Sequence, residues 1–183
     1  MKKALLVIDY SYDFVALDGK LTAGKPAIAL EDSIADRIDA ADKNGEDIFF
    51  MMDLHYENDT HHPEHKLFPP HNIAGTPGRE LYGKVLEKYK EIEGQNNVFF
   101  LDKTRYSAFS GTPLRHLLQE RGIDTVVLTG VVTDICIMHT AVDAYNSGYG
   151  IIVPESCVAS FSPDGHKVSL EHFKNTLGAT VEP

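Results

Sequence analysis

Short apolar runs alternate with longer amphipathic stretches along most of the chain. The runs at 4–8, 48–52, 98–101, 125–129 and 150–153 are rich in Val, Ile, Leu and Phe. The continuous hydrophobicity of the runs at 4–8 and 48–52 is typical of strands that are buried in a parallel sheet. A short sixth strand is predicted at 179–181.

Apolar residues at helical spacing occupy the segments between these runs. Such stripes run from Ala27 to Ala41, from Leu81 to Ile92 and from Ile135 to Tyr145. Two more helices are expected from Pro113 up to Gly122, and from Ser162-Pro163 to about Leu177. Strands that alternate with helices predict one three-layer α/β/α domain over residues 1–183, with a mostly parallel six-stranded sheet.

Composition narrows the classes of partner and compartment. The 183 residues are 43% hydrophobic and 24% charged, which suits one domain with a sizeable core. A net charge of −10 argues against nucleic acid and anionic membrane as partners. No run is long enough to span a bilayer, and the apolar run after Lys2-Lys3 is too short for a signal peptide. Two cysteines imply no disulfide framework, so we expect a cytoplasmic protein.

Three reactive or ionisable side chains follow three of the predicted strands. Asp9 follows the first strand, Lys103 the third, and Cys136 lies shortly after the fourth. In open parallel sheets, ligands bind at the carboxyl ends of the strands, so these groups are expected to meet there. Each alone has a simpler explanation, as a capping aspartate, a solvated lysine or a core cysteine. Because the three residues occur together at three strand ends, we favour the interpretation that they form a catalytic site.

Cys136 is predicted to lie in the first turn of a helix. Free N–H groups and the partial positive charge at that end lower a thiol pKa and can hold an oxyanion. Lys103 would stabilise the thiolate, and Asp9 would take the thiol proton and return it to a leaving amine. Cys157 has no comparable charged neighbours in the sequence and is interpreted as structural.

A histidine-rich loop at 53–78 suggests a metal site. Asp53 and His55 point to one side of an extended segment, and the loop adds His61, His62, Glu64, His65 and His71. Such side chains suit zinc, iron or manganese with positions left for water or substrate. A solvated polar loop is the alternative, and composition does not choose among the four later histidines.

The chain resembles the isochorismatase-like cysteine hydrolase superfamily and, within it, the nicotinamidases (pyrazinamidases). The resemblance covers essentially the whole chain and is carried by five segments: Leu6-Val7-Ile8-Asp9 followed by Asp13-Phe14, Asp53-Leu54-His55, Gly75-Thr76-Pro77-Gly78-Arg79-Glu80-Leu81, Leu101-Asp102-Lys103, and Gly130-Val131-Val132-Thr133-Asp134-Ile135-Cys136. It implies that Asp9, Lys103 and Cys136 form the catalytic triad. Ser11 departs from the pattern, since many members carry Gln there.

The resemblance also implies a metal centre. Its ligands would be Asp53, His55 and His71, with Glu64 as a further ligand bound directly or through water. One divalent ion is implied, with zinc favoured over iron and manganese. Isochorismatases do not need this metal set, so its presence favours the nicotinamidases.

Further family features concern the substrate. The resemblance implies a cis peptide bond between Val131 and Val132, which turns the Val132 amide toward the site. The N–H groups of Val132 and Cys136 would then form the oxyanion hole. Nicotinamide is the implied substrate, with Phe14, Phe68 and Tyr106 packed on its ring, and the implied role is NAD salvage. A homo-oligomer stays open, because relatives range from monomers to higher assemblies.

Three other functions remain in competition. Another amidase of the superfamily would act on a ureido or carbamoyl substrate without metal. A non-catalytic metal- or ligand-binding domain would tolerate loss of Lys103. A thiol redox sensor is disfavoured, because Cys136 has no resolving cysteine near it in sequence.

Overall fold

Parallel strands form the centre of the molecule. The computed structural model describes residues 1–183. Its sheet has the strand order β3-β2-β1-β4-β5-β7, and a short β6 pairs with β4. All of these pairs are parallel. The strands are β1 (Lys3–Ile8), β2 (Asp47–Asp53), β3 (Val98–Lys103), β4 (Thr125–Val131), β5 (Gly150–Pro154), β6 (Val158–Ala159) and β7 (Thr180–Glu182). The predicted α/β fold is confirmed, with seven strands where six were expected.

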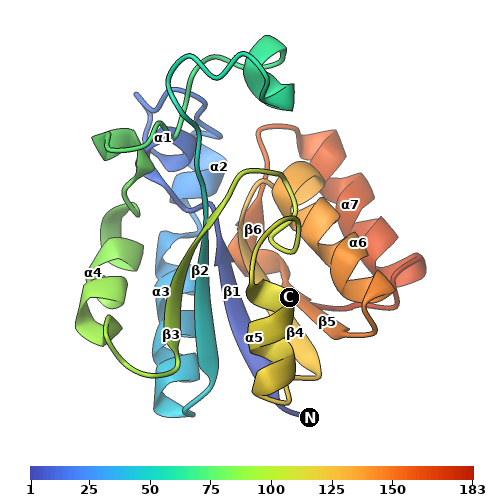
Figure 1. Cartoon of the computed structure of the whole chain (residues 1–183). Coiled ribbons are helices and arrows are strands. Elements are labelled where there is room, and N and C mark those ends of the chain that lie inside the picture. The colour runs from blue at the N-terminus through green and yellow to red at the C-terminus, as the bar shows by residue number, and fades with distance from the viewer.

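Helices cover both faces of this sheet (Figure 1). The α-helices are α1 (Tyr12–Val15), α2 (Lys25–Ile28), α3 (Glu31–Lys43), α4 (Gly83–Ile92), α5 (Leu114–Glu120), α6 (Met138–Asn146) and α7 (Pro163–Asn175). Shorter turns are η1 (Pro63–Lys66), η2 (Pro77–Arg79), η3 (Thr133–Ile137) and η4 (Glu155–Cys157). None of the helices combines the length and apolar character that crossing a bilayer requires.

Alternate residues of each central strand pack into two separate cores. In β1, Leu6 and Ile8 join the core under α5, α6 and α7, whereas Leu5 and Val7 join the core under α3 and α4. Strand side chains alternate between faces, so a strand covered on both sides must be apolar throughout. This explains why the sequences of the central strands are continuously hydrophobic.

One local prediction about the helices was wrong in detail. The stripe from Ala27 to Ala41 is two helices, α2 and α3, separated at Ala29 and Leu30. The acidic pair Glu31 and Asp32 opens α3, where negative charge is favourable at a helix N-terminus. The segment that carries Cys136 is the wider π-turn η3, which leads into α6.

The topology brings β1 and β4 together at the middle of the sheet. They pair along their whole lengths, up to Ile8 opposite Gly130. Their neighbours are β2 on one side and β5 on the other. The long loop between β2 and α4 lies over the carboxyl ends of the strands, at the top of Figure 1. The residues after β1, β2, β3 and β4 therefore share one end of the sheet.

Gly130 permits the close approach of β1 and β4 just below that end. Its φ is 114°, and an added Cβ would lie 1.9 Å from the carbonyl oxygen of Ile8. We therefore expect Gly130→Ala to lower the free energy of unfolding by at least about 3 kcal/mol, as measured by urea denaturation. Gly122→Ala is the matched control, because φ is 63° there and a Cβ meets nothing within 4 Å. A cost at Gly130 no larger than the control's cost of about 1 kcal/mol would refute this explanation.

Candidate active site

Asp9, Lys103 and Cys136 form one buried cluster. Lys103 Nζ lies 2.7 Å from Asp9 Oδ2 and 3.7 Å from Cys136 Sγ. The exposed fractions are 0% for Asp9, 1% for Lys103 and 7% for Cys136. The three residues come from the ends of β1 and β3 and from η3 after β4. The sequence-based expectation that they meet at one end of the sheet therefore agrees with their positions.

Asp9 is held in an unusual backbone conformation. Its φ is 55°, which is uncommon for a residue other than glycine and is tolerated best by Asp and Asn. The Asp53 amide donates to Asp9 Oδ1 at 2.8 Å, which leaves Oδ2 facing Lys103. Burial raises the pKa of Asp9 to about 6; the Lys103 charge opposes this shift and the Asp53 carboxylate adds to it. A carboxylate with that pKa is suited to move protons near neutral pH.

The Cys136 thiol differs from the expectation drawn from its helical position. Burial raises its pKa well above the usual range; Lys103 opposes this shift, and Asp9 and Asp53 add to it. The predicted lowering was wrong, because desolvation outweighs any gain from a helix N-terminus. The thiol also hydrogen-bonds with Asp9, which provides a route for the proton.

Lys103 is fully buried as a cation. Burial alone would lower its pKa, but Asp9, Cys136 and Asp53 together hold it above the usual range. Its Nζ also donates to the carbonyl of Arg105 at 3.1 Å. A charge held in this way offsets negative charge that develops on the thiol.

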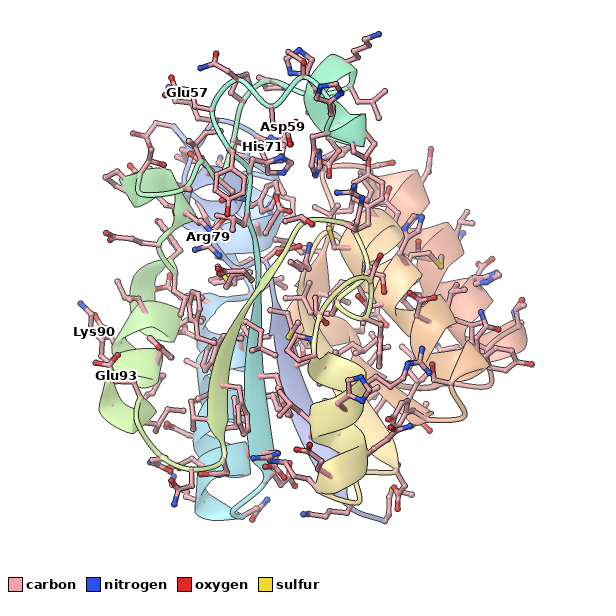
Figure 2. The ribbon with its side chains drawn as sticks, in the orientation of Figure 1. Glu57, Asp59, His71, Arg79, Lys90 and Glu93 are labelled. Atoms are coloured by element: carbon pink, nitrogen blue, oxygen red, sulfur yellow. The ribbon has the colours of Figure 1, made fainter.

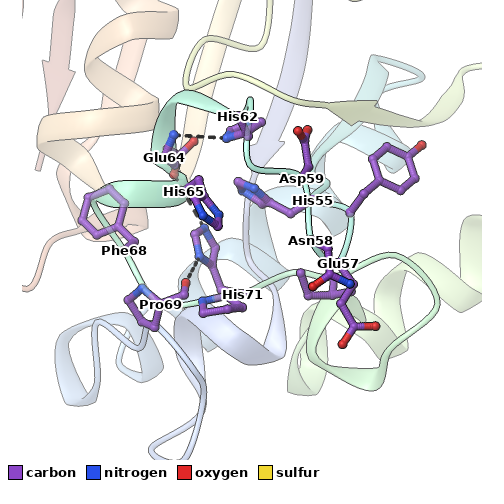
Figure 3. A pocket seen from close by; sticks show the side chains of 13 residues that line it. His55, Glu57, Asn58, Asp59, His62, Glu64, His65, Phe68, Pro69 and His71 are labelled. Atoms are coloured by element: carbon purple, nitrogen blue, oxygen red, sulfur yellow. Dashed lines mark hydrogen bonds and ion pairs between the residues drawn. The ribbon is translucent and has the colours of Figure 1, made fainter.

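The predicted metal ligands lie beside this cluster. Asp53 Oδ2 is 2.8 Å from His55 Nε2 and 3.4 Å from His71 Nε2. Glu64 Oε2 is 3.7 Å from His71 Nε2. All four side chains are buried, although three of them come from a loop. Figure 3 shows His55, Glu64 and His71 around one cavity. The volume of this cavity is about 290 Å³.

The hydrogen bonds of two loop histidines separate a ligand from a supporting residue. His71 Nδ1 donates to the Pro69 carbonyl at 2.7 Å, so its Nε2 carries the lone pair when the ring is neutral. His62 uses both nitrogens, because Nε2 donates to the Thr104 carbonyl at 2.7 Å and Nδ1 accepts from the Glu64 amide at 3.2 Å. His62 therefore holds the loop rather than offering a free ligand atom. His61 and His65 are exposed.

These residues fit a divalent cation. Asp53, His55 and His71 each offer a ligand atom within 4.8 Å of the others, and a ligand atom of Glu64 lies within 4.8 Å of one of His55. The buried Nε2 of His71 has no hydrogen-bond partner. The pKa of Asp53 lies well below its usual range. Burial alone would raise this pKa, but Lys103 and the two neighbouring histidines lower it. Burial and Asp53 raise the pKa of Glu64, so a cation at this position would relieve a crowded pair of carboxylates.

Asp53 belongs to both groups of residues. Its Oδ2 faces the histidines, and its Oδ1 lies 3.8 Å from Lys103 Nζ. The residue ends β2, next to the end of β3, where Asp53 pairs with Lys103 in register. A cation at the histidines would therefore lie close to the triad.

Arg79 fixes this corner of the sheet from outside. It donates through Nε to the Asp53 carbonyl at 2.8 Å and through Nη2 to the Met52 carbonyl at 3.3 Å. It also forms an ion pair with Asp102, beside Lys103. Figure 2 shows Arg79 below His71, near the ends of β2 and β3. Arg79 lies in one of the segments that carry the family resemblance, but the sequence indicated no role for it.

A small apolar cavity opens next to Cys136. Its volume is about 30 Å³, and it is lined by all three predicted ring contacts, Phe14, Phe68 and Tyr106. The remaining lining residues are Leu21, Glu64, Val132, Ile135, Cys136 and Phe161. The sequence-based predictions did not include three of these wall residues, Leu21, Ile135 and Phe161. Only Ile135 had a signal, since it directly precedes the predicted nucleophile; Leu21 and Phe161 lie far from every motif.

The predicted oxyanion hole lies on the same side. The peptide bond between Val131 and Val132 is cis, as the family resemblance implied. The Val132 amide donates to no group within the chain. Val132 and Cys136 both line the apolar cavity.

Comparison with known proteins gives a consistent match over the whole chain. Residues 3–182 match the isochorismatase domain model. A solved pyrazinamidase/nicotinamidase from Streptococcus mutans UA159 is 58% identical, with a TM-score of 0.97 over 98% of this chain and 99% of that one. Nicotinamidase/pyrazinamidase PncA from Bacillus subtilis is 50% identical, with a TM-score of 0.98 over 100% of both chains. Pyrazinamidase of Pyrococcus horikoshii, solved in complex with zinc, is 25% identical, with a TM-score of 0.86 over 99% and 98%.

Proposed function

The chain belongs to the isochorismatase family, and on that premise we propose that it is a nicotinamidase, which hydrolyses nicotinamide to nicotinate and ammonia and also accepts pyrazinamide. One observation carries the proposal. A buried Asp-Lys-Cys cluster, a set of metal-binding side chains and an apolar cavity with aromatic walls adjoin one another, with Asp53 shared by the first two. A nicotinamidase needs all three parts. The Asp-Lys-Cys cluster would act on the amide, the metal-binding side chains would hold the ion that faces the ring nitrogen, and the aromatic walls would contact the ring face.

The proposed reaction begins with the neutral thiol. Asp9 takes the proton of Cys136 as the sulfur attacks the carboxamide carbon, while Lys103 balances the negative charge. The carbonyl oxygen becomes an oxyanion, which the amides of Val132 and Cys136 would bind. Asp9 then gives the proton to the amide nitrogen, the C–N bond breaks and ammonia departs. A thioester with Cys136 remains. Asp9 next removes a proton from water, which attacks the thioester and releases nicotinate and the thiol.

The apolar cavity would position the ring for this attack. Phe14, Phe68 and Tyr106 offer flat or edge contacts to a pyridine ring, and Cys136 lies in the same wall. At about 30 Å³ the cavity holds little more than one water. Phe161, one of the wall residues, has 49% of its surface exposed.

A divalent ion at Asp53, His55, His71 and Glu64 would orient the ring and polarise it or a bound water. Zinc fits the mixed histidine and carboxylate ligands, and a zinc-containing relative supports it. Iron and manganese bind similar side chains and are the alternatives. We place the enzyme in NAD salvage in the cytoplasm, and its two unpaired cysteines are compatible with a reducing compartment.

We expect His55→Ala to reduce metal binding by about 10- to 100-fold or more, because it removes one side chain from the proposed set. Metal content of the purified protein, measured by mass spectrometry of the elements, checks this. His61→Ala is the matched control, because His61 lies in the same loop but is exposed. Equal metal content in both variants would contradict the assignment of His55.

A panel of amides tests the substrate class. Ammonia release is measured with nicotinamide, pyrazinamide, a ureido acid and an N-carbamoyl amino acid under identical conditions. The proposal predicts the highest kcat/KM for the two aromatic amides, because the cavity walls are aromatic. A preference for the ureido or carbamoyl compounds would overturn it in favour of another amidase of the family. No release from any of them would favour a non-catalytic domain.

A further inference from the structure

Asn72 contacts the proposed metal site through three parts of the residue. Its side-chain Nδ2 donates to Asp53 Oδ2 at 3.3 Å. Its carbonyl oxygen accepts from the His55 amide at 3.1 Å. It also follows His71 directly in the chain. One buried residue, with 1% of its surface exposed, therefore contacts or adjoins three of the four proposed ligands.

We propose that Asn72 is a positioning residue of the metal site: it directs Asp53 Oδ2 toward the cation, and Ser11 fixes the orientation of its amide. The proposal rests on the metal-dependent function proposed above. It adds a role for two residues that lie outside the triad, the ligand set and the ring cavity.

Asp53 needs such a partner because its two oxygens face different groups. Oδ1 lies 3.8 Å from Lys103 Nζ, whereas Oδ2 lies 2.8 Å from His55 Nε2. A histidine nitrogen that binds a cation carries no proton, so it can no longer donate to the carboxylate. The Asn72 amide keeps its proton in either state. It can therefore hold Asp53 Oδ2 in place when the cation arrives.

Ser11 determines which way the Asn72 amide faces. Ser11 Oγ donates to Asn72 Oδ1 at 2.8 Å, and Ser11 is itself 1% exposed. An ionised carboxylate only accepts hydrogen bonds, so the amide nitrogen must face Asp53. The opposite orientation would place Asn72 Oδ1 against Asp53 Oδ2, two acceptors in contact. Ser11 stabilises the productive orientation by supplying the oxygen with its own donor.

The backbone of Asn72 is set independently of its side chain. Its φ is 46°, in the left-handed region that Asn and Gly tolerate best. Its amide donates to Asp13 Oδ2 at 2.8 Å. Glycine at this position would keep both features and remove only the side-chain amide. Asn72→Gly therefore isolates the contact with Asp53 from the shape of the loop.

The test measures metal affinity apart from turnover. Metal-free protein is titrated with Co²⁺, followed by its visible absorption, and with Zn²⁺ in competition with a coloured chelator. We expect Asn72→Gly to weaken both affinities by about 10- to 100-fold, and Ser11→Ala to weaken them in the same direction by less. Asn44→Gly is the control for the same substitution, because Asn44 is exposed at the end of α3, outside the loop and the cavity that carry the proposed ligands. Its affinity should equal that of the unmodified protein.

The dependence of turnover on metal provides the second readout. For Asn72→Gly the half-saturating metal concentration should rise by the same factor, and excess metal should restore the turnover that is lost at low metal. Unchanged Co²⁺ and Zn²⁺ affinities would overturn the proposal, as would a lower kcat that excess metal does not restore. If Asn72→Gly does not fold, Ser11→Ala decides between these outcomes. Failure of the unmodified protein to bind metal would instead refute the metal site itself, which is a distinguishable result.

Discussion

Replacing Cys136 with alanine is expected to lower kcat for nicotinamide by at least about 10⁴-fold while leaving the fold intact. The sulfur is the only group in the cluster that can form the proposed thioester. Lys103 Nζ, at 3.7 Å, and the Asp9 carboxylate would remain paired with each other at 2.7 Å. The substitution removes one buried atom, so we expect a stability cost of about 1 kcal/mol.

Cys157→Ala is the control for this experiment. Cys157 is also buried, with 1% of its surface exposed, but it lies in η4 and lines no part of the cavity beside Cys136. Its loss should leave kcat unchanged and cost similar stability. Turnover by Cys136→Ala within tenfold of the unmodified protein would contradict the nucleophile assignment.

Asp9→Asn should lower kcat by about 10³-fold, because the amide cannot take the thiol proton. Asparagine has nearly the same shape and tolerates the φ of 55° at this position, so the backbone should stay in place. The change leaves Lys103 with Asp53 as its nearest carboxylate, at 3.8 Å, so some stability is lost as well. The measurement is kcat at saturating nicotinamide, together with the rate at which iodoacetamide alkylates Cys136.

If Asp9 removes the thiol proton, kcat should fall in Asp9→Asn, whereas the alkylation rate should not fall, because the Asp9 charge no longer raises the pKa of Cys136. Asp18→Asn is the control, because it makes the same change of charge on an exposed carboxylate. Thermal denaturation of both variants shows whether the protein is still folded. Full activity in folded Asp9→Asn would mean that another group accepts the proton.

The sheet and the proximity of Asp9, Lys103 and Cys136 were accessible from the sequence for a simple physical reason. Strands buried on both faces must be apolar throughout, so their ends are visible as the points where charged residues appear. Asp9 marks one of these points and Cys136 follows another, whereas Lys103 ends the edge strand β3, which is only partly buried. Parallel strands bring such points to one edge, whatever the details of the helices. The cis bond at Val131 came from family resemblance alone, since no local pattern signals it.

Features that depend on burial in three dimensions were not accessible in this way. The raised pKa of Cys136 follows from desolvation by parts of the chain far away in sequence. Ser11 and Asn72 look like ordinary turn residues, yet they lie buried against each other across 61 positions. Phe161 enters the cavity wall from the segment after β6. The break between α2 and α3 occurs within an uninterrupted apolar stripe, so periodicity alone did not reveal it.

Ammonia release from nicotinamide, measured before and after removal of metal by a chelator, tests the proposed chemistry most directly. We predict release that falls on chelation, returns when Zn²⁺ is added back, and is absent in Cys136→Ala under every condition. Release that persists in Cys136→Ala, or that chelation leaves unchanged, would contradict a metal-dependent cysteine amidase.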